Sequence, residues 1–336
     1  MSGKWSDRLV KPSTRRFAEE ARRTPGYTWF DFVHGYVYGR WPYLYIGIGT
    51  GEHRLAKAWA RLSRWFARLS PRRPAREADE AVHTGPQNGR VRRSTPGQLA
   101  FSHTYHGKVV PLQPATQLVS VREAVSLGDL EQVIPYQRAR DIILQNPDHI
   151  VALDCPCRVS RVNPCLPLDV CLIVGEPFAG FVREHQPERT RWISPAEAVG
   201  ILQAEDARGH VHHAFFKDAM FGRFYAICNC CACCCGAMQA QRNGTPMLAS
   251  SGYLSHVDED LCIGCGECAA FCQFGALSVP ATLAVVDGEA CMGCGVCVGK
   301  CEQGALSLAR EPAKGIPLDI RQLIGLATSD EQPRAV

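Results

Sequence analysis

The feature that most constrains the fold is a spacing of cysteines that occurs twice near the end of the chain. The segments LCIGCGECAAFCQFGALSV (261–279) and ACMGCGVCVGKCEQGALSL (290–308) align without a gap, 29 positions apart. Each contains C-x2-C-x2-C-x3-C, and three glycines, one alanine, one leucine and one serine recur at equivalent positions around these cysteines. The last 80 or so residues are therefore predicted to form a small separate domain with an internal repeat.

This spacing is the run of cysteines that binds a 4Fe–4S cube. Three cysteines two residues apart lie on a tight loop that can place three sulfurs on three corners of one cube. Glycines between them, at 264, 266, 293 and 295, allow the close turn and bring backbone amides toward the sulfurs. The fourth cysteine begins the next helical turn and ligates the neighbouring cube. The predicted ligands are Cys262, Cys265, Cys268 and Cys301 for one cube, and Cys291, Cys294, Cys297 and Cys272 for the other.

Residues 255–310 resemble the bacterial two-cluster ferredoxins. The resemblance departs at one point, because the proline that usually follows the fourth cysteine is replaced by Gln273 and Glu302. Structural zinc is the competing interpretation, but it prefers thiolates in two separated pairs and would leave the double run of four unexplained. The resemblance implies two 4Fe–4S clusters and electron transfer.

Eighteen cysteines in 336 residues are many, and the cellular compartment decides how they are interpreted. The first twenty residues lack the apolar run of a secretory signal, and no stretch of about 18 apolar residues could span a membrane. We therefore expect a reducing cytoplasm, where clustered thiolates bind metal in preference to forming disulfides.

Ten cysteines remain in two middle segments, CPCRVSRVNPCLPLDVC (155–171) and CNCCACCC (228–235). Adjacent cysteines on an extended segment point to opposite faces, so the six in CNCCACCC cannot all reach one ion. They could instead serve two sites on either side of the segment. The candidate ligands are Cys155, Cys157, Cys165, Cys171, Cys228, Cys230, Cys231 and Cys234. One or two further iron–sulfur clusters are the first interpretation; zinc, free thiols and a cluster with an open iron are the alternatives.

A CPCR segment, a distant CNCC and a C-terminal ferredoxin repeat resemble a group of multi-cluster iron–sulfur proteins of anaerobic and photosynthetic bacteria. Arg158 and Arg161 either offset the charge of a bound cluster or lie on the surface. His210, His212 and His213 are candidate ligands or proton donors, although structural roles are the simpler interpretation.

Charge is distributed unevenly along the chain. Residues 1–100 contain 19 Lys and Arg against 8 Asp and Glu, whereas the remainder contains 18 against 25 and all of the cysteines. Residues 54–69 have helical periodicity with a basic face, and 70–97 read as a linker. The basic region is predicted to dock on an acidic partner or on the inner membrane face, or else to pack on its own domain. No nucleic acid is expected as a partner.

The predicted fold class is α+β. It has four parts: a basic, partly helical region (1–98), a mixed α/β cysteine-rich domain (99–242), a ferredoxin-like domain (250–312) and a tail (313–336). Within the second part, LDVCLIVGE is expected to be a buried strand. Ser194, Pro195 and Glu197 are expected to begin a helix with a capping box that ends before Gly209. Residues 241–256 are expected to be a connector.

These features predict an electron-transfer protein or redox subunit that serves donor and acceptor proteins. Two alternatives remain open. One is a reductase whose middle-domain cluster binds substrate, with His212 or His213 as proton source; the other is a scaffold for cluster assembly. No nucleotide or flavin motif is present, and no catalytic residue is assigned.

Overall fold

A computed structural model describes residues 10–56, 58, 94–128, 130–138 and 140–330 of the chain. The predicted amphipathic helix over 54–69 and the linker over 70–97 lie mostly outside these residues. None of the described helices combines the length and the apolar character needed to cross a membrane.

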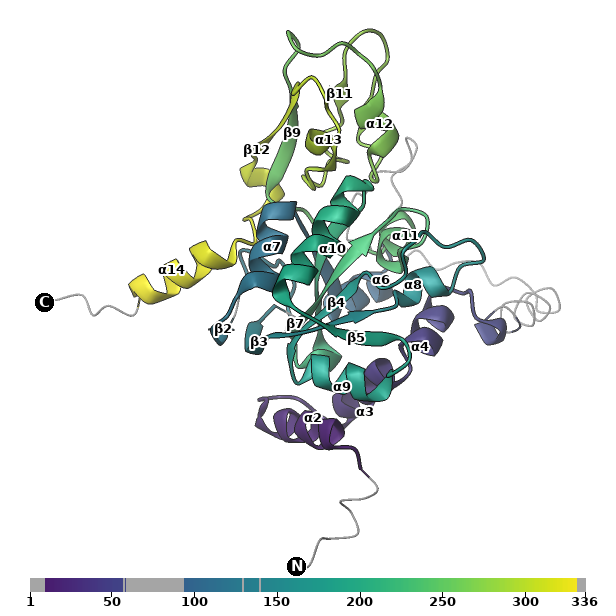
Figure 1. The fold of residues 1–336 in the computed structure, drawn as a ribbon, viewed down its shortest axis with the longest axis vertical. Helices are drawn as coiled ribbons and strands as arrows, with labels where there is room; N and C mark the ends of the chain where they lie inside the picture. The colour runs from purple at the N-terminus through teal and green to yellow at the C-terminus, as the bar shows by residue number, and fades with distance from the viewer. Residues whose placement is uncertain (1–9, 57, 59–93, 129, 139, 331–336) are drawn as a thin grey trace, which may run out of the picture.

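A largely antiparallel sheet forms the centre of the molecule (Figure 1). Its strands follow the order β2-β3-β4-β7-β6-β1-β8, with β5 paired to β3 beside this path, and among the strands that the structure describes only β1 and β8 pair in parallel. The strands are β1 (Tyr105–Val110), β2 (Val125–Leu127), β3 (Ile142–Leu153), β4 (Cys171–Glu176), β5 (Thr190–Ile193), β6 (Val211–Lys217), β7 (Arg223–Cys230) and β8 (Leu248–Ala249). The predicted strand LDVCLIVGE is β4, which is buried along its first five residues.

Helices cover both faces of this sheet, which makes a mixed α/β structure (Figure 1). One face carries α7 (Leu112–Ser120), α10 (Pro195–Ala207) and α14 (Ile320–Asp330). The other carries α2 (Pro12–Arg23), α3 (Trp29–Arg40), α4 (Pro42–Gly49), α9 (Phe178–His185) and α11 (Gly236–Arg242). Short helices α6 (Pro96–Ser102), α8 (Pro156–Val159), η1 (Asp218–Met220) and η2 (Pro312–Lys314) complete the connections.

The N-terminal helices pack into the core of the cysteine-rich domain. Phe17 of α2 is fully buried, and its ring lies 5.0 Å from that of Phe181 and 4.6 Å from that of Phe221. Glu20 forms an ion pair with Arg223 of β7 at 2.6 Å. Residues 12–49 therefore form one wall of the space that the middle cysteines enclose.

The start of α10 matches its sequence signal in part. Ser194 caps the helix by accepting a hydrogen bond from the Glu197 amide at 3.1 Å, and Gly209 follows the helix with φ of +81°. The Glu197 carboxylate, however, pairs with Arg191 instead of closing the predicted capping box. The N-cap was correctly predicted, and the side-chain partner of Glu197 was not.

The C-terminal domain stands at one end of the central unit, next to α7 and α10 (Figure 1). Strands β9 (Tyr253–Val257) and β12 (Leu306–Arg310) form one antiparallel pair, and β10 (Leu277–Ser278) and β11 (Val285–Val286) form another. Helices α12 (Glu267–Phe271) and α13 (Val296–Gly299) lie between them in sequence. The predicted connector over 241–256 is wrong in part, because it contains β8, which pairs with β1, and most of β9.

Candidate metal centres

The two middle cysteine segments meet because of the pairing of the central strands. Cys171 begins β4, Cys228 lies near the end of β7, and these two residues are direct partners in the antiparallel register. Cys155 and Cys157 follow the end of β3, the other neighbour of β4. Cys235 is the residue before α11. Strands distant in sequence thus bring both segments to one edge of a shared cavity.

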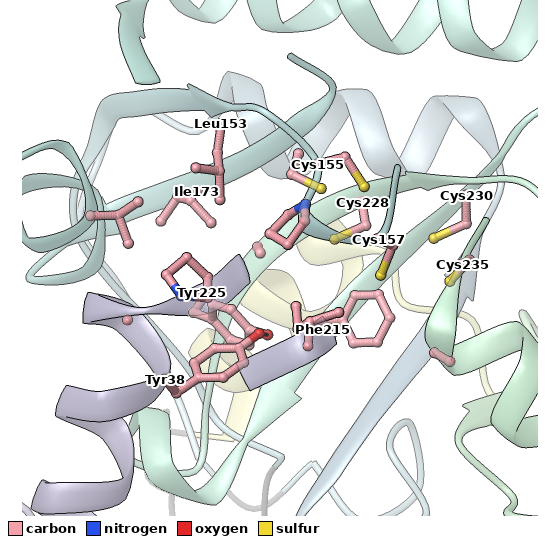
Figure 2. Close-up of a pocket in the computed structure, with 18 of the residues that line it drawn as sticks. Tyr38, Leu153, Cys155, Cys157, Ile173, Phe215, Tyr225, Cys228, Cys230 and Cys235 are labelled. Atoms are coloured by element: carbon pink, nitrogen blue, oxygen red, sulfur yellow. Dashed lines mark hydrogen bonds between the residues drawn. The ribbon is translucent and has the colours of Figure 1, made fainter. Parts of the chain in front are cut away.

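Eight cysteines line this cavity, which we call the thiol chamber, and six of them form an arc of neighbouring thiols (Figure 2). The thiols of the arc belong to Cys155, Cys157, Cys171, Cys228, Cys230 and Cys235. The space between them and the facing aromatic residues has a volume of about 70 Å³. That is enough for several water-sized groups. Because four of the six residues are less than 9% exposed, the chamber is an internal site.

The chamber thiols form an arc in which neighbours contact one another. Cys171 lies between Cys228 and Cys155, while Cys157 lies between Cys155 and Cys235. The hydrogen bond with the Cys157 thiol raises the pKa of Cys155 to about 12. The hydrogen bond with the Cys171 thiol opposes this shift, and burial adds to it. Cys155 is thus a neutral thiol unless a cation stabilises its thiolate. A metal centre is such a cation, and these residue types fit one.

The other four middle cysteines gather outside the arc. The thiols of Cys165, Cys231, Cys233 and Cys234 all lie within 4.8 Å of one another. Those of Cys165 and Cys233 are 3.2 Å apart, and those of Cys233 and Cys234 are 3.7 Å apart. CNCCACCC therefore divides its six thiols equally between two places, as the sequence allowed, although strict alternation would exchange Cys234 and Cys235. We call this second group the outer thiol cluster.

Sequence reasoning omitted Cys233 and Cys235 from the candidate ligands, and the structure gives each a place. Cys235 belongs to the thiol chamber and Cys233 to the outer thiol cluster. Nothing in their local spacing distinguished them from their neighbours. Their direction depends on the turn between β7 and α11, which alternation alone does not specify.

Two arginines that follow Cys157 in the chain form hydrogen bonds beside the thiol chamber and the outer thiol cluster. Arg158 is 1% exposed and pairs with the buried Glu205 at 2.5 Å, while its guanidinium also donates to the carbonyl of Asn229 at 3.1 Å. Arg161 donates to the carbonyl of Cys234 at 3.1 Å. For Arg158, the predicted surface alternative is wrong, because a buried network of ion pairs and hydrogen bonds holds it beside the cysteines.

Aromatic residues form the wall of the chamber opposite the thiols (Figure 2). The hydroxyls of Tyr38 and Tyr225 are 2.7 Å apart, and Tyr105 also lines the cavity. Burial raises the pKa of each of these phenols, so they remain protonated donors. The sequence signalled none of them, because they come from α3, β1 and β7.

A buried lysine lies behind this aromatic wall. The ammonium of Lys217 is 4.5 Å from the ring centre of Tyr105 and 5.1 Å from that of Tyr38. Burial lowers the pKa of Lys217 to about 8, and Asp218 partly opposes this shift. The ammonium therefore adds positive charge to this side of the chamber near neutral pH.

The three histidines of β6 and its approach have different surroundings. His210 bonds to Glu205 at 2.6 Å and His212 to Asn229 at 2.6 Å, so both belong to the polar network under the cysteines. His213 is fully buried, and neither ring nitrogen has a hydrogen-bond partner among the described residues. Burial lowers its pKa to about 3, and its ring faces Phe274 of the C-terminal domain. His213 is therefore neutral and points toward the domain contact.

The eight C-terminal cysteines gather in the two predicted sets. A cavity is lined by Cys262, Cys265, Cys268 and Cys301 together. Cys272, Cys291, Cys294 and Cys297 lie near one another in a second group. In each set the fourth cysteine comes from the other copy of the repeat.

Backbone conformation and hydrogen bonds in this domain suit bound clusters. Gly264 and Gly293 occupy equivalent positions and have φ of +67° and +63°. A Cβ at either would lie 2.2 Å from a carbonyl oxygen, so only glycine fits. The amide of Ala276 donates to the Cys272 sulfur at 3.2 Å, and that of Ala284 to the Cys262 sulfur at 3.4 Å. Such bonds stabilise ligating thiolates and tune cluster potentials.

Gln273 joins the ferredoxin domain to CNCCACCC. Its side-chain oxygen accepts from the Ala232 amide at 2.8 Å, and its side-chain nitrogen donates to the Gly209 carbonyl at 2.9 Å. Arg242 spans the same contact, donating to the carbonyls of Ala232 at 2.9 Å and Gln273 at 3.2 Å. The residue that departs from the ferredoxin pattern therefore makes the contact between domains. Glu302, its equivalent in the second repeat, is exposed.

Comparison with known families supports the assignment of this C-terminal region. Residues 255–278 and 284–307 each match the model of the 4Fe-4S binding domain. No curated protein matches the chain. The C-terminal part of the chain therefore carries a 4Fe–4S binding domain, which with the abundance of cysteines indicates an iron–sulfur electron-transfer protein.

Proposed function

We propose that the chain relays single electrons between a redox partner at the exposed end of its ferredoxin domain and a metal centre in the thiol chamber. The observation that carries this proposal is the Gln273 contact, because it joins the Cys272 loop to the turn between the chamber and the outer thiol cluster. When bound, each 4Fe–4S cube supplies one-electron chemistry. The two C-terminal sets of four cysteines would hold one cube each.

The outer end of the ferredoxin domain has the features of a docking surface. Cys265 is exposed, and the neighbouring side chains of Ile263 and Leu261 are 67% and 48% exposed. An apolar rim beside an exposed ligand allows a partner protein to approach closely. The opposite set, which includes Cys272, faces the cysteine-rich domain. The basic N-terminal region remains a proposed second docking surface for an acidic partner or a membrane.

The thiol chamber would hold the internal centre of the relay. The six thiols of its arc exceed the four ligands of one cube and are two short of the eight that two cubes would need, so they suffice for one further cube. The chamber is buried, and the phenols opposite the thiols provide hydrogen-bond donors. Burial and such donors are the means by which a protein sets cluster potentials.

The relay is tested by replacing Gln273 in the full chain. Gln273→Ala removes two hydrogen bonds of about 1 kcal/mol each, which weakens docking about thirtyfold. We expect electron transfer from the reduced ferredoxin domain to the middle domain to slow to a similar extent, with iron content unchanged. Rapid-freeze electron paramagnetic resonance of anaerobic protein measures this rate. Glu302→Ala is the matched control, and Cys157→Ser identifies the signal of the middle domain.

Equal rates in Gln273→Ala and Glu302→Ala would show that the relay does not use this contact. A middle-domain signal that never changes on reduction of the ferredoxin domain would contradict the relay itself.

A reductase is the second candidate, because hydrogen-bond donors and thiols face one another across the chamber. Tyr38 and Tyr225 lie where a small molecule bound to a cluster could accept a hydrogen bond or a proton. This replaces His212 and His213 as the proton source, since His212 is engaged with Asn229 and His213 faces Phe274.

Small ligands of iron test this candidate. Cyanide, azide or carbon monoxide is expected to change the middle-domain paramagnetic signal with saturation. Tyr225→Phe is expected to lower the affinity about fivefold, the cost of one hydrogen bond. A signal that is indifferent to all three probes would eliminate the reductase.

A further inference from the structure

The outer thiol cluster has the dimensions of a single-ion site. Its four thiols lie within 4.8 Å of one another, and two pairs are 3.2 and 3.7 Å apart. Four thiolates at about 2.3 Å from one tetrahedral zinc ion stand about 3.8 Å apart. In a cube, each thiolate binds a different iron and points outward, so the sulfurs stand farther apart. The spacing therefore fits one ion and is too small for four irons.

The cluster is separate from the chamber in ligands but shares a wall with it. The chamber arc uses six other cysteines, while Cys231 and Cys234 of the outer thiol cluster also line the chamber. Cys233 is exposed and Cys165 is partly exposed, so an ion can reach the site from solvent. The arrangement gives an inner centre and a surface centre on opposite sides of CNCCACCC.

The turn that carries three of these thiols is fixed by its neighbours. Its carbonyls accept from Arg161 at Cys234, from Arg242 at Ala232 and from the Gln239 side chain at Cys233, at 3.1, 2.9 and 2.9 Å. Four thiolates and one divalent ion carry a charge of −2. Arg161 and Arg242 lie against the same turn, and Arg158 is close to Cys231, so positive charge surrounds the site.

We propose that Cys165, Cys231, Cys233 and Cys234 bind one divalent ion, zinc or iron, in a tetrahedral site distinct from every iron–sulfur cluster. Tetrahedral sets of four thiolates select these metals. Binding displaces thiol protons to solvent and joins the CPCR segment to CNCCACCC. Ala232, whose amide donates a hydrogen bond to the side chain of Gln273, lies between two ligands. The ion thus fixes the point where the ferredoxin domain docks. This role in docking rests on the proposed relay, but the existence of the ion site does not depend on the relay.

Metal analysis of the full chain, purified without oxygen, tests the site. We expect one zinc, or one iron without associated sulfide, per chain beyond the clusters. Cys233→Ser and Cys165→Ser should each lower the content of this ion at least tenfold and leave acid-labile sulfide unchanged. Cys157→Ser, which alters the chamber, is the control and should retain the ion. A ferrous ion would show the high-spin paramagnetic signal of a single ferric site after one-electron oxidation by ferricyanide, and zinc would be silent.

A measurement on the unaltered chain avoids dependence on variants that fold poorly. Cys165 and Cys233 should resist alkylation until a chelator is added, and cobalt(II) added to the stripped protein should give thiolate charge-transfer absorption. A disulfide between Cys165 and Cys233, loss of sulfide with the ion in Cys233→Ser, or alkylation unaffected by chelator would overturn the site. Loss of the ion with an unchanged relay rate would overturn only its role in docking.

Discussion

Replacing Arg158 by Met is expected to lower the free energy of unfolding by about 3 kcal/mol, the lower end of the cost of removing one partner of a buried ion pair, because Arg208 and His210 still contact the Glu205 carboxylate. Arg158 and Glu205 are 1% and 0% exposed, so solvent cannot stabilise the remaining carboxylate. Arg158 also donates to the carbonyls of Pro167 and Asn229, which would lose a donor. For a domain of this size the thermal midpoint should fall by about 10 °C.

Arg191→Met is the matched control for this prediction. Arg191 also pairs with two carboxylates, those of Asp169 and Glu197, but it is 45% exposed. Exposed pairs of this kind contribute about 1 kcal/mol or less. Circular dichroism of anaerobic protein measures both midpoints. Equal shifts of the thermal midpoint in the two variants would mean that the buried ion pair of Arg158 contributes no more stability than an exposed one.

The ionisation of Glu205 predicts how the stability contributed by this ion pair changes with pH. Burial by itself raises the pKa of Glu205, but bonds and charges from His210 and Arg158 outweigh it and hold the pKa below the ordinary 4.5. Since the folded pKa is the lower one, this stabilisation is complete above about pH 4.5 and is lost as pH falls through the folded pKa. The free energy of unfolding of Glu205→Gln should therefore differ most from that of the unaltered protein near neutral pH, and this difference should become smaller in acid.

Two double variants are expected to remove different amounts of iron from the C-terminal domain, although each removes two thiols. If the repeats exchange their last cysteines, Cys262→Ala with Cys301→Ala disables one cube and loses about four irons. Cys262→Ala with Cys272→Ala disables both cubes and loses about eight. The structure supports this exchange, because Cys301 lines one cavity with Cys262, Cys265 and Cys268.

Iron and acid-labile sulfide analysis of the full chain measures both double variants. Electron paramagnetic resonance identifies which signal survives in the first of them. If instead the Cys262 and Cys272 pair lost only four irons, each cube would take all its ligands from one copy of the repeat.

Local residue spacing was sufficient to predict those features that a single short segment of the chain forms by itself. The C-terminal cysteines, the tight turns at Gly264 and Gly293, the Ser194 cap and the buried strand β4 all follow from residues a few positions apart. Local spacing did not predict the positions of Cys233 and Cys235, the hydrogen bonds of Gln273 or the aromatic wall of the chamber. Each of these depends on a partner at least 40 residues away in sequence, such as Ala232 for Gln273.

The sequence by itself determined that this chain binds iron–sulfur clusters at its C-terminal end, because a cluster loop is a local structure whose geometry is written in its spacing. It also indicated that the six thiols of CNCCACCC cannot all reach one ion and could serve two places, since neighbouring side chains point in different directions. Only the tertiary structure decided which thiols form the chamber, which form the outer cluster and where the ferredoxin domain docks. The physical reason is that strand pairing between β3, β4 and β7 sets these positions, and pairing partners are chosen by the whole core.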